Sequence, residues 1–274
     1  MVRGRAVPSF TPGRRDRPTV PREMSLPQNP VIVIPARLAS KRFPGKPLAD
    51  IHGEPMIVHV WRRATEAGIG PVVVACADQA IASAVEAVGG RAVMTRPGHP
   101  SGSDRAFEAL QAVDEAGAFD AVVNVGCDVL TLEPNYIHQA LAPLEEAAVD
   151  IGTIAAEITD PAERDDPAVV KAVVALEPGA GIGRALYFSR TAVPAGDGPL
   201  YHHIGLYAFR RAALERFVAW PPGPLEQRER LEQLRALEGG MRIDVALVDT
   251  TPLHVNTPAD LARARALLKP APGG

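Results

Sequence analysis

Short apolar runs alternate with longer amphipathic stretches through the first half of the chain. Each run has the length and the β-branched content of a buried strand, and each stretch between the runs has helical length. Strands that alternate with helices predict a mostly parallel sheet with helices on both faces, a Rossmann-like α/β fold. The expected strands are 31–34, 71–75, 91–95, 120–125 and 150–157, and the expected helices are 55–68, 78–88, 101–116 and 134–147.

The second half of the chain has a different pattern. Three strand-like segments, at 169–176, 182–189 and 201–209, are joined by turns rich in glycine and proline. They predict either an antiparallel extension of the sheet or a small lobe. The remaining expected elements are a helix at 224–238, a strand at 242–248 and a last helix that begins after Thr257.

This pattern indicates one α/β domain over residues 31–268 with a tail at each end. Residues 1–30 are rich in proline and arginine and have no hydrophobic period, so we expect a disordered or non-native segment, with Met24 as the natural start. The segment lacks the apolar stretch of a secretory signal. Residues 269–274 form the second tail.

The composition excludes several classes of protein. The formal net charge is −3 over 274 residues, and residues 1–30 hold six arginines, so the domain itself is acidic. An acidic domain argues against a general nucleic-acid binder. No run of about 18 apolar residues is present, which argues against a membrane span. The 2 cysteines do not make a disulfide framework, and we expect a cytoplasmic protein.

One loop, PARLASKRFPGKP at 35–47, concentrates positive charge directly after the first expected strand. A basic, glycine-containing loop between a strand and a helix is typical of a phosphate site. Prolines stiffen this loop, and rigidity lowers the entropy cost of holding a ligand, which a solvated basic loop would not need. The cations are Arg37, Lys41, Arg42 and Lys46, and the prolines are Pro35, Pro44 and Pro47.

Several motifs together resemble the sugar-acid cytidylyltransferases, and most closely the 3-deoxy-manno-octulosonate (Kdo) cytidylyltransferases. The similarity runs from about Val31 to Leu268, and its specificity lies in the order and spacing of the motifs. The motifs are PARLASKRFPGKPL (35–48), RPGHPSGSDR (96–105), ALYFSR (185–190), HHIGLY (202–207), PLEQRERLEQLR (224–235) and NTPADL (256–261).

The resemblance implies a CTP site with Arg42, Lys46 and Asp128 as catalytic residues. Cations in the loop would neutralise the triphosphate, and the stretch from His99 to Arg105 would help to hold the nucleotide. By spacing alone, Arg105 on the first turn of its helix is equally well a surface charge. The implied nucleotide-binding residues are Pro35, Ala36, Arg37, Ser40, Arg42, Lys46, Ser101, Gly102 and Arg105.

The resemblance also implies Mg²⁺ as the cofactor, bound by Asp128 and, more weakly, by Asn256. Asp128 follows the strand at 120–125, at the strand end where ligands bind in α/β sheets. The family has an aspartate where this chain has Asn256, and a neutral carbonyl oxygen binds a hard cation less well than a carboxylate. The departures from the family pattern are Cys76, Ala77, Gly126, Cys127 and Asn256.

On the sugar side, the resemblance implies contacts to the carboxylate and hydroxyls of a sugar acid. His203 and Tyr207 are four residues apart on an expected strand and therefore face the same side. Spacing alone also fits a half-buried strand face for this pair and a solvated helix charge for Glu232. The implied sugar-binding residues are Arg190, His203, Tyr207, Glu232 and Gln233, and the family further implies a homodimer.

The implied activity joins CTP and Kdo to give CMP-Kdo and pyrophosphate for lipopolysaccharide biosynthesis. One alternative is a catalytically impaired relative that binds nucleotide or sugar acid, because the departures fall on the nucleotide and metal side. Another is a cytidylyltransferase for a different sugar acid, such as an amino-Kdo. Cys127 has no local base and is interpreted as structural. The absence of G-x-G-x-x-G after the first strand disfavours a dehydrogenase.

Overall fold

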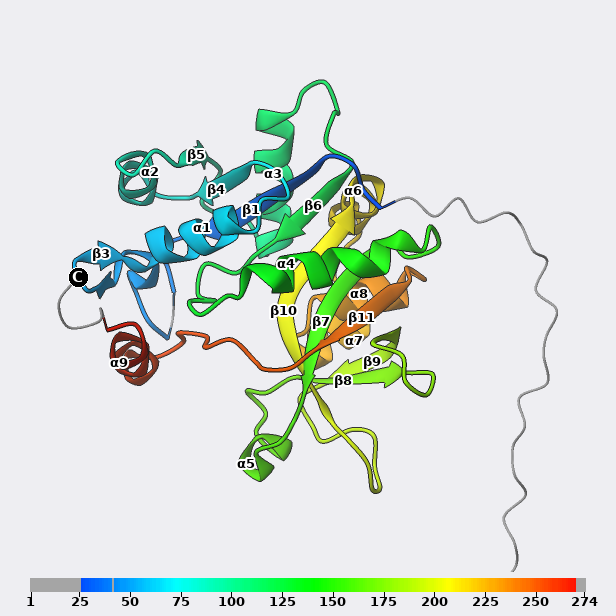
Figure 1. Ribbon diagram of the computed structural model, residues 1–274. Helices are drawn as coiled ribbons and strands as arrows, with labels where there is room; N and C mark the ends of the chain where they lie inside the picture. Colours follow the sequence, from blue (N-terminus) through cyan, green and yellow to red (C-terminus); the bar gives the residue numbers. More distant parts are fainter. Residues whose placement is uncertain (1–25, 41, 270–274) are drawn as a thin grey trace, which may run out of the picture.

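A computed structural model describes residues 26–40 and 42–269. Among these residues, nine strands form one sheet in the order β5-β4-β1-β6-β10-β7-β11-β9-β8 (Figure 1). Lys41, residues 1–25 of the expected N-terminal tail and residues 270–274 of the expected C-terminal tail lie outside the described residues. The strands of the sheet are β1 Pro30–Ala36, β4 Val72–Cys76, β5 Arg91–Met94, β6 Ala121–Asn124, β7 Ile151–Glu157, β8 Lys171–Ala175, β9 Ile182–Ser189, β10 Tyr201–Arg210 and β11 Ile243–Val248, beside a hairpin of β2 Asp50–Ile51 and β3 Glu54–Pro55.

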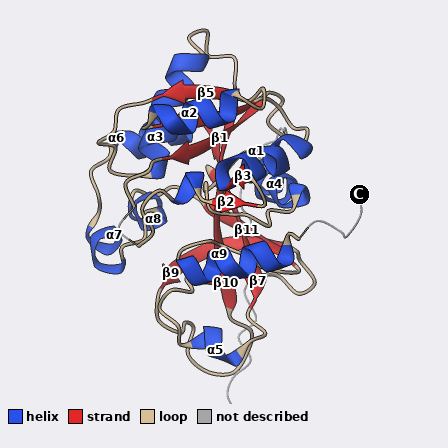
Figure 2. Cartoon of the chain, turned by 90° about the vertical axis from the view of Figure 1, so that its left-hand side faces the viewer, coloured by secondary structure: helices blue, strands red, loops and turns tan. Residues whose placement is uncertain are grey.

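Helices cover both faces of the sheet (Figure 2). Ile57 of α1 and Ile137 of α4 pack into the core on one face, and Leu110 of α3 and Phe217 of α6 pack into the core on the other. The helices are α1 Met56–Glu66, α2 Gln79–Glu86, α3 Gly102–Val113, α4 Pro134–Leu141, α5 Pro161–Arg164, α6 Arg211–Ala219, α7 Pro224–Glu229, α8 Gln233–Glu238 and α9 Pro258–Leu267, with 3₁₀ turns η1 Lys46–Leu48 and η2 Ala142–Glu145.

Strand β1 lies near the middle of the sheet and is buried from both sides. Ile32 and Ile34 pack into one core and Val31 and Val33 into the other, because successive side chains of a strand point to opposite faces. β1 pairs in parallel with β4 on one edge and with β6 on the other. The loop at 35–47 therefore leaves from the interior of the sheet, at its carboxyl edge.

The direction of the strands confirms the α/β fold and places one strand unexpectedly. All strands of the large sheet except β9 and β10 run the same way. β10 is not part of an edge extension but lies between β6 and β7, antiparallel to both. β8 and β9 do extend the sheet, and β8 also pairs with Tyr201 and His202 at the start of β10. The last five strands, from β10 to β8, thereby close into a ring at this end.

The helix expected at 224–238 is two helices, so that prediction was wrong. Arg230 between them has a φ of 56°, in the left-handed region that ends an α-helix. α6 was not predicted either. Thr257 does cap α9, since its side chain accepts a hydrogen bond from the backbone N–H of Asp260. No helix in the described part of the chain is long and apolar enough to cross a membrane.

Candidate active site

A cavity of about 690 Å³ opens at the carboxyl edge of the sheet, between the loop at 35–47 and the start of α3. All nine residues implied as nucleotide-binding line it, together with Ala39, His99 and Cys127. Residues from 35–46 and from 99–105 thus meet around one space large enough for a nucleotide. The nine are Pro35, Ala36, Arg37, Ser40, Arg42, Lys46, Ser101, Gly102 and Arg105.

The basic loop is folded back on itself at Leu38. The carbonyl oxygen of Leu38 accepts hydrogen bonds from the backbone N–H groups of Ser40 (2.9 Å) and Gly45 (3.0 Å). The N–H of Leu38 donates to Asp78 Oδ2 at 2.8 Å, so the carboxylate at the start of α2 braces the loop. Gly45, at a φ of 73°, provides the left-handed turn that leads into η1 and places Lys46.

Two loop cations contact the two residues implied as metal ligands. Lys46 Nζ lies 2.6 Å from Asp128 Oδ2, and Arg42 Nη2 donates to Asn256 Oδ1 at 2.9 Å. His254 Nδ1 lies 3.8 Å from Asp128 Oδ1 and was not predicted from the sequence. Burial alone would raise the pKa of Asp128, but His254 and Lys46 bring that pKa well below its usual range. Asp128 is therefore an anion at neutral pH.

Gly126, one of the departures from the family pattern, lies against Asp128. A Cβ atom at position 126 would lie 2.8 Å from Asp128 Oδ1 and 3.3 Å from Val129 Cγ2, so a side chain there displaces one of them. The departure at 126 is thus part of how this chain places its carboxylate. Cys127 lines the cavity, and burial raises the pKa of its thiol to about 12, in keeping with a structural rather than a nucleophilic residue.

The donors available to a metal ion fit Mg²⁺ on a nucleotide and not a protein cage. Among residues 26–40 and 42–269, no group of three or more His, Cys, Asp or Glu side chains could hold an ion. Asp128 supplies one carboxylate, and the amide oxygen of Asn256 already accepts from Arg42. Mg²⁺ is commonly bound by one or two carboxylates with water and substrate phosphates, so a single carboxylate is sufficient.

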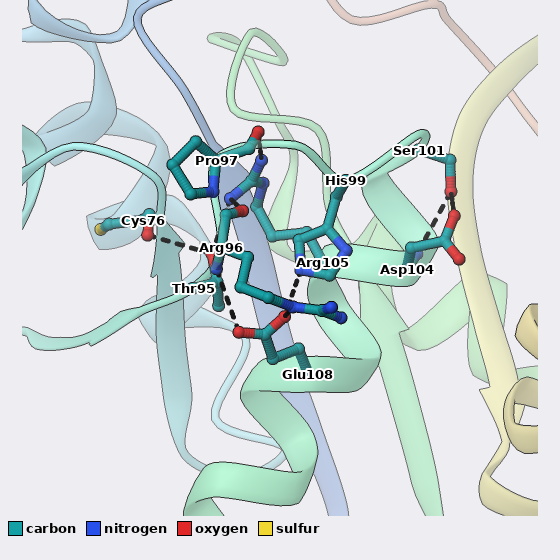
Figure 3. A network of polar contacts seen from close by, with 9 residues as sticks. All are labelled: Cys76, Thr95, Arg96, Pro97, His99, Ser101, Asp104, Arg105 and Glu108. Atoms are coloured by element: carbon teal, nitrogen blue, oxygen red, sulfur yellow. Dashed lines mark hydrogen bonds and ion pairs between the residues drawn. The ribbon is translucent and has the colours of Figure 1, made fainter.

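Arg105 is a buried residue that holds the wall of the cavity, and not a surface charge (Figure 3). Its guanidinium donates to Thr95 Oγ1 at 2.6 Å and to the carbonyl oxygens of Arg96 (3.0 Å) and Pro97 (3.1 Å). Burial and the charge of Arg37 lower its pKa from the ordinary value. Arg105 therefore fixes the 95–97 turn that leads to His99.

His99 is held in the same wall by Glu108 of α3. Figure 3 shows the Glu108 carboxylate between the His99 ring and Arg96. It bonds His99 Nε2 and accepts from Arg96 Nε (2.9 Å) and Arg96 N (3.0 Å). Neither the role of Glu108 nor its pairing with His99 was predicted, because a spacing of nine residues across a helix start gives no recognisable sequence signal.

The N-terminus of α3 is directed at the cavity. Ser101 caps it by accepting from the N–H of Asp104 at 3.1 Å, and Ser101 and Gly102 both line the cavity. Free N–H groups and the helix dipole at such an end favour an anionic ligand. A phosphate in the cavity would thus meet positive potential from α3 as well as from the loop.

Three of the five residues implied as sugar-binding surround a void of about 10 Å³ next to the first cavity, called the narrow cavity below, which is too small for a sugar acid as it stands. Tyr207, Glu232 and Gln233 line it with Ser103, which follows Gly102 on α3, and with the apolar side chains of Ile151, Phe209 and Phe217. Glu232 Oε1 is buried and has no hydrogen-bond partner within the part of the chain that the structure describes. Burial raises the pKa of Glu232 more than Ser103 and Ser101 lower it. An unpartnered buried oxygen here is suited to accept from a ligand hydroxyl.

His203 lies behind Tyr207 and is buried. Its ring centroid is 5.4 Å from that of Tyr207 and 4.7 Å from that of Phe188, and its Nε2 bonds Thr153 Oγ1 at 3.0 Å. Burial lowers the pKa of His203 to about 3, so the ring is neutral. β10 has an irregularity between Ile204 and Tyr207, but His203 and Tyr207 pair with β7 residues two apart and so still face one side, as predicted.

Arg190 is not among the residues that line this narrow cavity. Its guanidinium donates to three backbone carbonyl oxygens, those of Glu229 (3.0 Å), Pro167 (2.9 Å) and Arg230 (3.3 Å). The structure therefore brings together Tyr207, Glu232 and Gln233, puts His203 behind them, and commits Arg190 to the backbone near α7.

Comparison with known proteins places these residues in a family. The model of a family described as "Cytidylyltransferase" matches residues 31–243. A 3-deoxy-manno-octulosonate cytidylyltransferase from Paramagnetospirillum magneticum is 65% identical over 240 residues, covering 88% of this chain and 98% of that protein. Another from Rhodospirillum centenum is 65% identical over 247 residues, covering 90% and 96%.

Two solved structures are also similar to this chain. A CMP:2-keto-3-deoxy-manno-octonic acid synthetase complexed with CTP is 39% identical, with a TM-score of 0.80, covering 88% of this chain and 98% of that one. A 4-diphosphocytidyl-2C-methyl-D-erythritol synthase from Anaerococcus prevotii is 13% identical with a TM-score of 0.59, covering 90% and 100%, and shows likeness of fold alone.

Proposed function

This chain belongs to the cytidylyltransferase family, and we propose that it joins CTP and 3-deoxy-manno-octulosonate to give CMP-Kdo and pyrophosphate. The observation that carries the proposal is the meeting of Arg42 and Lys46 with the start of α3 around one cavity, with Asp128 bonded to Lys46 at its edge. The 65% identity to relatives named for this reaction supports the choice of substrates. In a bacterial cell the product would serve lipopolysaccharide biosynthesis.

The nucleotide occupies the cavity between the loop at 35–47 and α3. Arg37, Arg42 and Lys46 neutralise the triphosphate, while the turn held by Arg105 forms the opposite wall. In the free protein Lys46 and Arg42 bond Asp128 and Asn256, and a triphosphate offers these cations a more highly charged partner. Binding of the nucleotide therefore releases the oxygens of Asp128.

The chemical step is a displacement at the α-phosphorus of CTP. The anomeric hydroxyl of the sugar acid forms the new O–P bond, the α–β anhydride bond breaks with release of pyrophosphate, and the hydroxyl proton passes to solvent water. The protein contributes position and charge: Lys46 and Arg42 stabilise the negative charge that grows on the phosphate oxygens. Magnesium, when bound through Asp128, polarises the phosphate and acidifies the attacking hydroxyl.

The sugar acid extends from the α-phosphate toward Tyr207, where the narrow cavity of about 10 Å³ must widen by movement of its lining side chains to admit a sugar hydroxyl. Glu232 Oε1, which has no hydrogen-bond partner among residues 26–40 and 42–269, accepts from a sugar hydroxyl. Gln233 supplies both a donor and an acceptor beside it. His203 supports Tyr207 from behind as a neutral ring, and Arg190 orders the backbone at the edge of this site.

The test is release of pyrophosphate from CTP by the purified chain, with Kdo or an amino-Kdo as acceptor and with Mg²⁺ or a chelator. Release is expected only with nucleotide, sugar acid and metal together. Asp128→Asn is expected to lower kcat by about a hundredfold or more, since removal of one charge-stabilising group costs that much in other enzymes. Faster turnover with the amino sugar would assign the other acceptor, and binding without turnover would assign a regulatory protein.

A homodimer in the cytoplasm completes the proposal. Ile182 and Leu186 leave apolar surface exposed on β9, at the end of the sheet where the ring of strands closes. A second copy would cover such a surface. Light scattering at micromolar concentration tests this. Twice the chain mass of 29.0 kDa is expected, and the mass of one chain would contradict a homodimer.

A further inference from the structure

Glu229, the last residue of α7, bonds the end of β9 through its carboxylate. Oε1 accepts from Ser189 Oγ at 3.0 Å and from the Tyr187 hydroxyl at 3.5 Å, and Oε2 accepts from the backbone N–H of Arg190 at 3.2 Å. One side chain therefore joins a helix at the surface to a strand of the sheet. No reacting group and no lining residue of either cavity is in this set.

Arg190, which directly follows β9, bonds the same turn through its side chain. Arg190 Nε donates to the carbonyl oxygen of Glu229 at 3.0 Å, and Arg190 Nη2 donates to that of Arg230 at 3.3 Å. Residues 229 and 230 are thus held by side chain and backbone at once. A guanidinium that donates to several backbone carbonyl oxygens fixes the conformation of that backbone segment.

The turn at residues 229 and 230 has an unfavourable backbone conformation. Arg230 has a φ of 56°, which a residue with a Cβ adopts only where its surroundings demand it. Arg230 ends α7 and, two residues later, Glu232 is the N-cap of α8 and Gln233 its first residue. The direction of this turn therefore decides where Glu232 and Gln233 lie relative to Tyr207.

Other polar contacts tie α8 to α7 and to the end of α6, where Arg235 donates to the carbonyl oxygens of Phe217 (3.4 Å) and Trp220 (3.3 Å). Arg235 donates to both carboxylate oxygens of Glu226 at 2.7 Å, which ties α8 to α7. Leu231 is buried in the core beneath them. Among the hydrogen bonds described for this turn, those of Glu229 and Arg190 join it to the end of β9, while Leu231 and Leu234 pack in the core below it.

We propose that Glu229 is a positioning residue for recognition of the sugar acid. It keeps the turn at Arg230 on β9 and so holds Glu232 and Gln233 in the narrow cavity beside Tyr207. The role of Glu229 rests on the proposed function of that cavity. It predicts an effect on the sugar acid alone, because the CTP cavity is built from the loop at 35–47 and from α3.

The experiment compares Glu229→Ala and Glu229→Gln in steady-state kinetics with each substrate varied in turn. Loss of hydrogen bonds to a charged group is expected to raise the KM for Kdo about tenfold to a hundredfold in the alanine variant. The KM for CTP is expected to stay within about twofold, as the accuracy of such comparisons allows. The glutamine variant keeps the acceptor oxygen and is expected to regain part of the loss.

Asp114→Asn is the matched control, because Asp114 is a buried carboxylate of similar bonding far from α7. It accepts from the N–H groups of Ala118 and Phe119 and from Arg211. This variant is expected to lower the melting temperature and to leave both KM values unchanged. An alanine variant at 229 that behaves in the same way would overturn the positioning role.

Glu232→Gln distinguishes failure of the positioning role of Glu229 from failure of the sugar-site assignment. A raised KM for Kdo in Glu232→Gln together with an unchanged one in Glu229→Ala contradicts the positioning role alone. An unchanged KM for Kdo in Glu232→Gln contradicts the assignment of the sugar cavity itself, and the positioning role fails with it.

Discussion

At the scale of single residues, the polar groups of the candidate active site bond one another. Lys46 bonds Asp128, and Arg42 bonds Asn256, so two of the cations implied in phosphate binding contact the residues implied in metal binding. The sequence motifs implied nine of the twelve described residues that line the large cavity. They could not predict His254 beside Asp128, because that contact depends on a bridge between distant segments at Val129 and His254.

Gly126 is expected to be required for the position of Asp128. In Gly126→Ala the added Cβ would meet Asp128 Oδ1 at 2.8 Å, and the displaced carboxylate is expected to lower kcat by about tenfold to a hundredfold. Kinetics with saturating CTP and Kdo measure this. Gly181→Ala is the control, since no atom lies within 4 Å of a Cβ there. Equal kcat values for both variants would contradict the account.

Glu232 is expected to lower the stability of the folded protein near neutral pH and to favour binding of the sugar acid. Burial raises its pKa in the folded protein, so its contribution to stability is full below the ordinary pKa and is lost as the pH rises through the folded value. Glu232→Gln keeps the neutral form at every pH. It is expected to be more stable than the parent by about 1–3 kcal/mol near neutral pH.

Thermal unfolding at about pH 8 and about pH 4 measures this difference, which should vanish at the acid value because the parent is then protonated. Titration with Kdo supplies the second readout, and the same variant should bind it more weakly. A variant less stable than the parent at the higher pH would show that the buried oxygen is satisfied after all.

At the scale of secondary-structure elements, apolar pattern predicted the elements that are buried and missed those set by tertiary contacts. β1, β4, β6 and β7 were predicted because they are nearly continuous apolar runs, as strands covered on both faces must be. The break between α7 and α8 had no such signal, since Arg230 is an ordinary helix former by propensity. Its left-handed backbone follows from contacts to β9.

Arg230→Gly is expected to stabilise this turn. Glycine adopts a φ of 56° without the clash of a Cβ, and its backbone carbonyl can still accept from Arg190. The gain is expected to be about 1 kcal/mol or less, because glycine also gains freedom in the unfolded chain. Denaturant unfolding measures it. A loss of stability would mean that the Arg230 side chain supports the turn.

At the scale of the whole molecule, one mostly parallel sheet brings the two candidate binding regions to neighbouring strands. The loop after β1 and the segment after β6 meet at the carboxyl edge, as expected for an α/β sheet. β10 between β6 and β7 then places Tyr207 next to that edge, with α8 beside it. The order of strands, which pattern alone did not give for β10, is what makes the large cavity and the narrow cavity neighbours.

The most direct test of this arrangement is pyrophosphate release by the full chain with CTP and Kdo, in the presence and absence of Mg²⁺. The account predicts metal-dependent release that needs both substrates and falls by about a hundredfold in Asp128→Asn. Release that is unchanged in Asp128→Asn, or no release while both CTP and Kdo bind, would contradict the central claim that Asp128 and the loop cations form a working transferase.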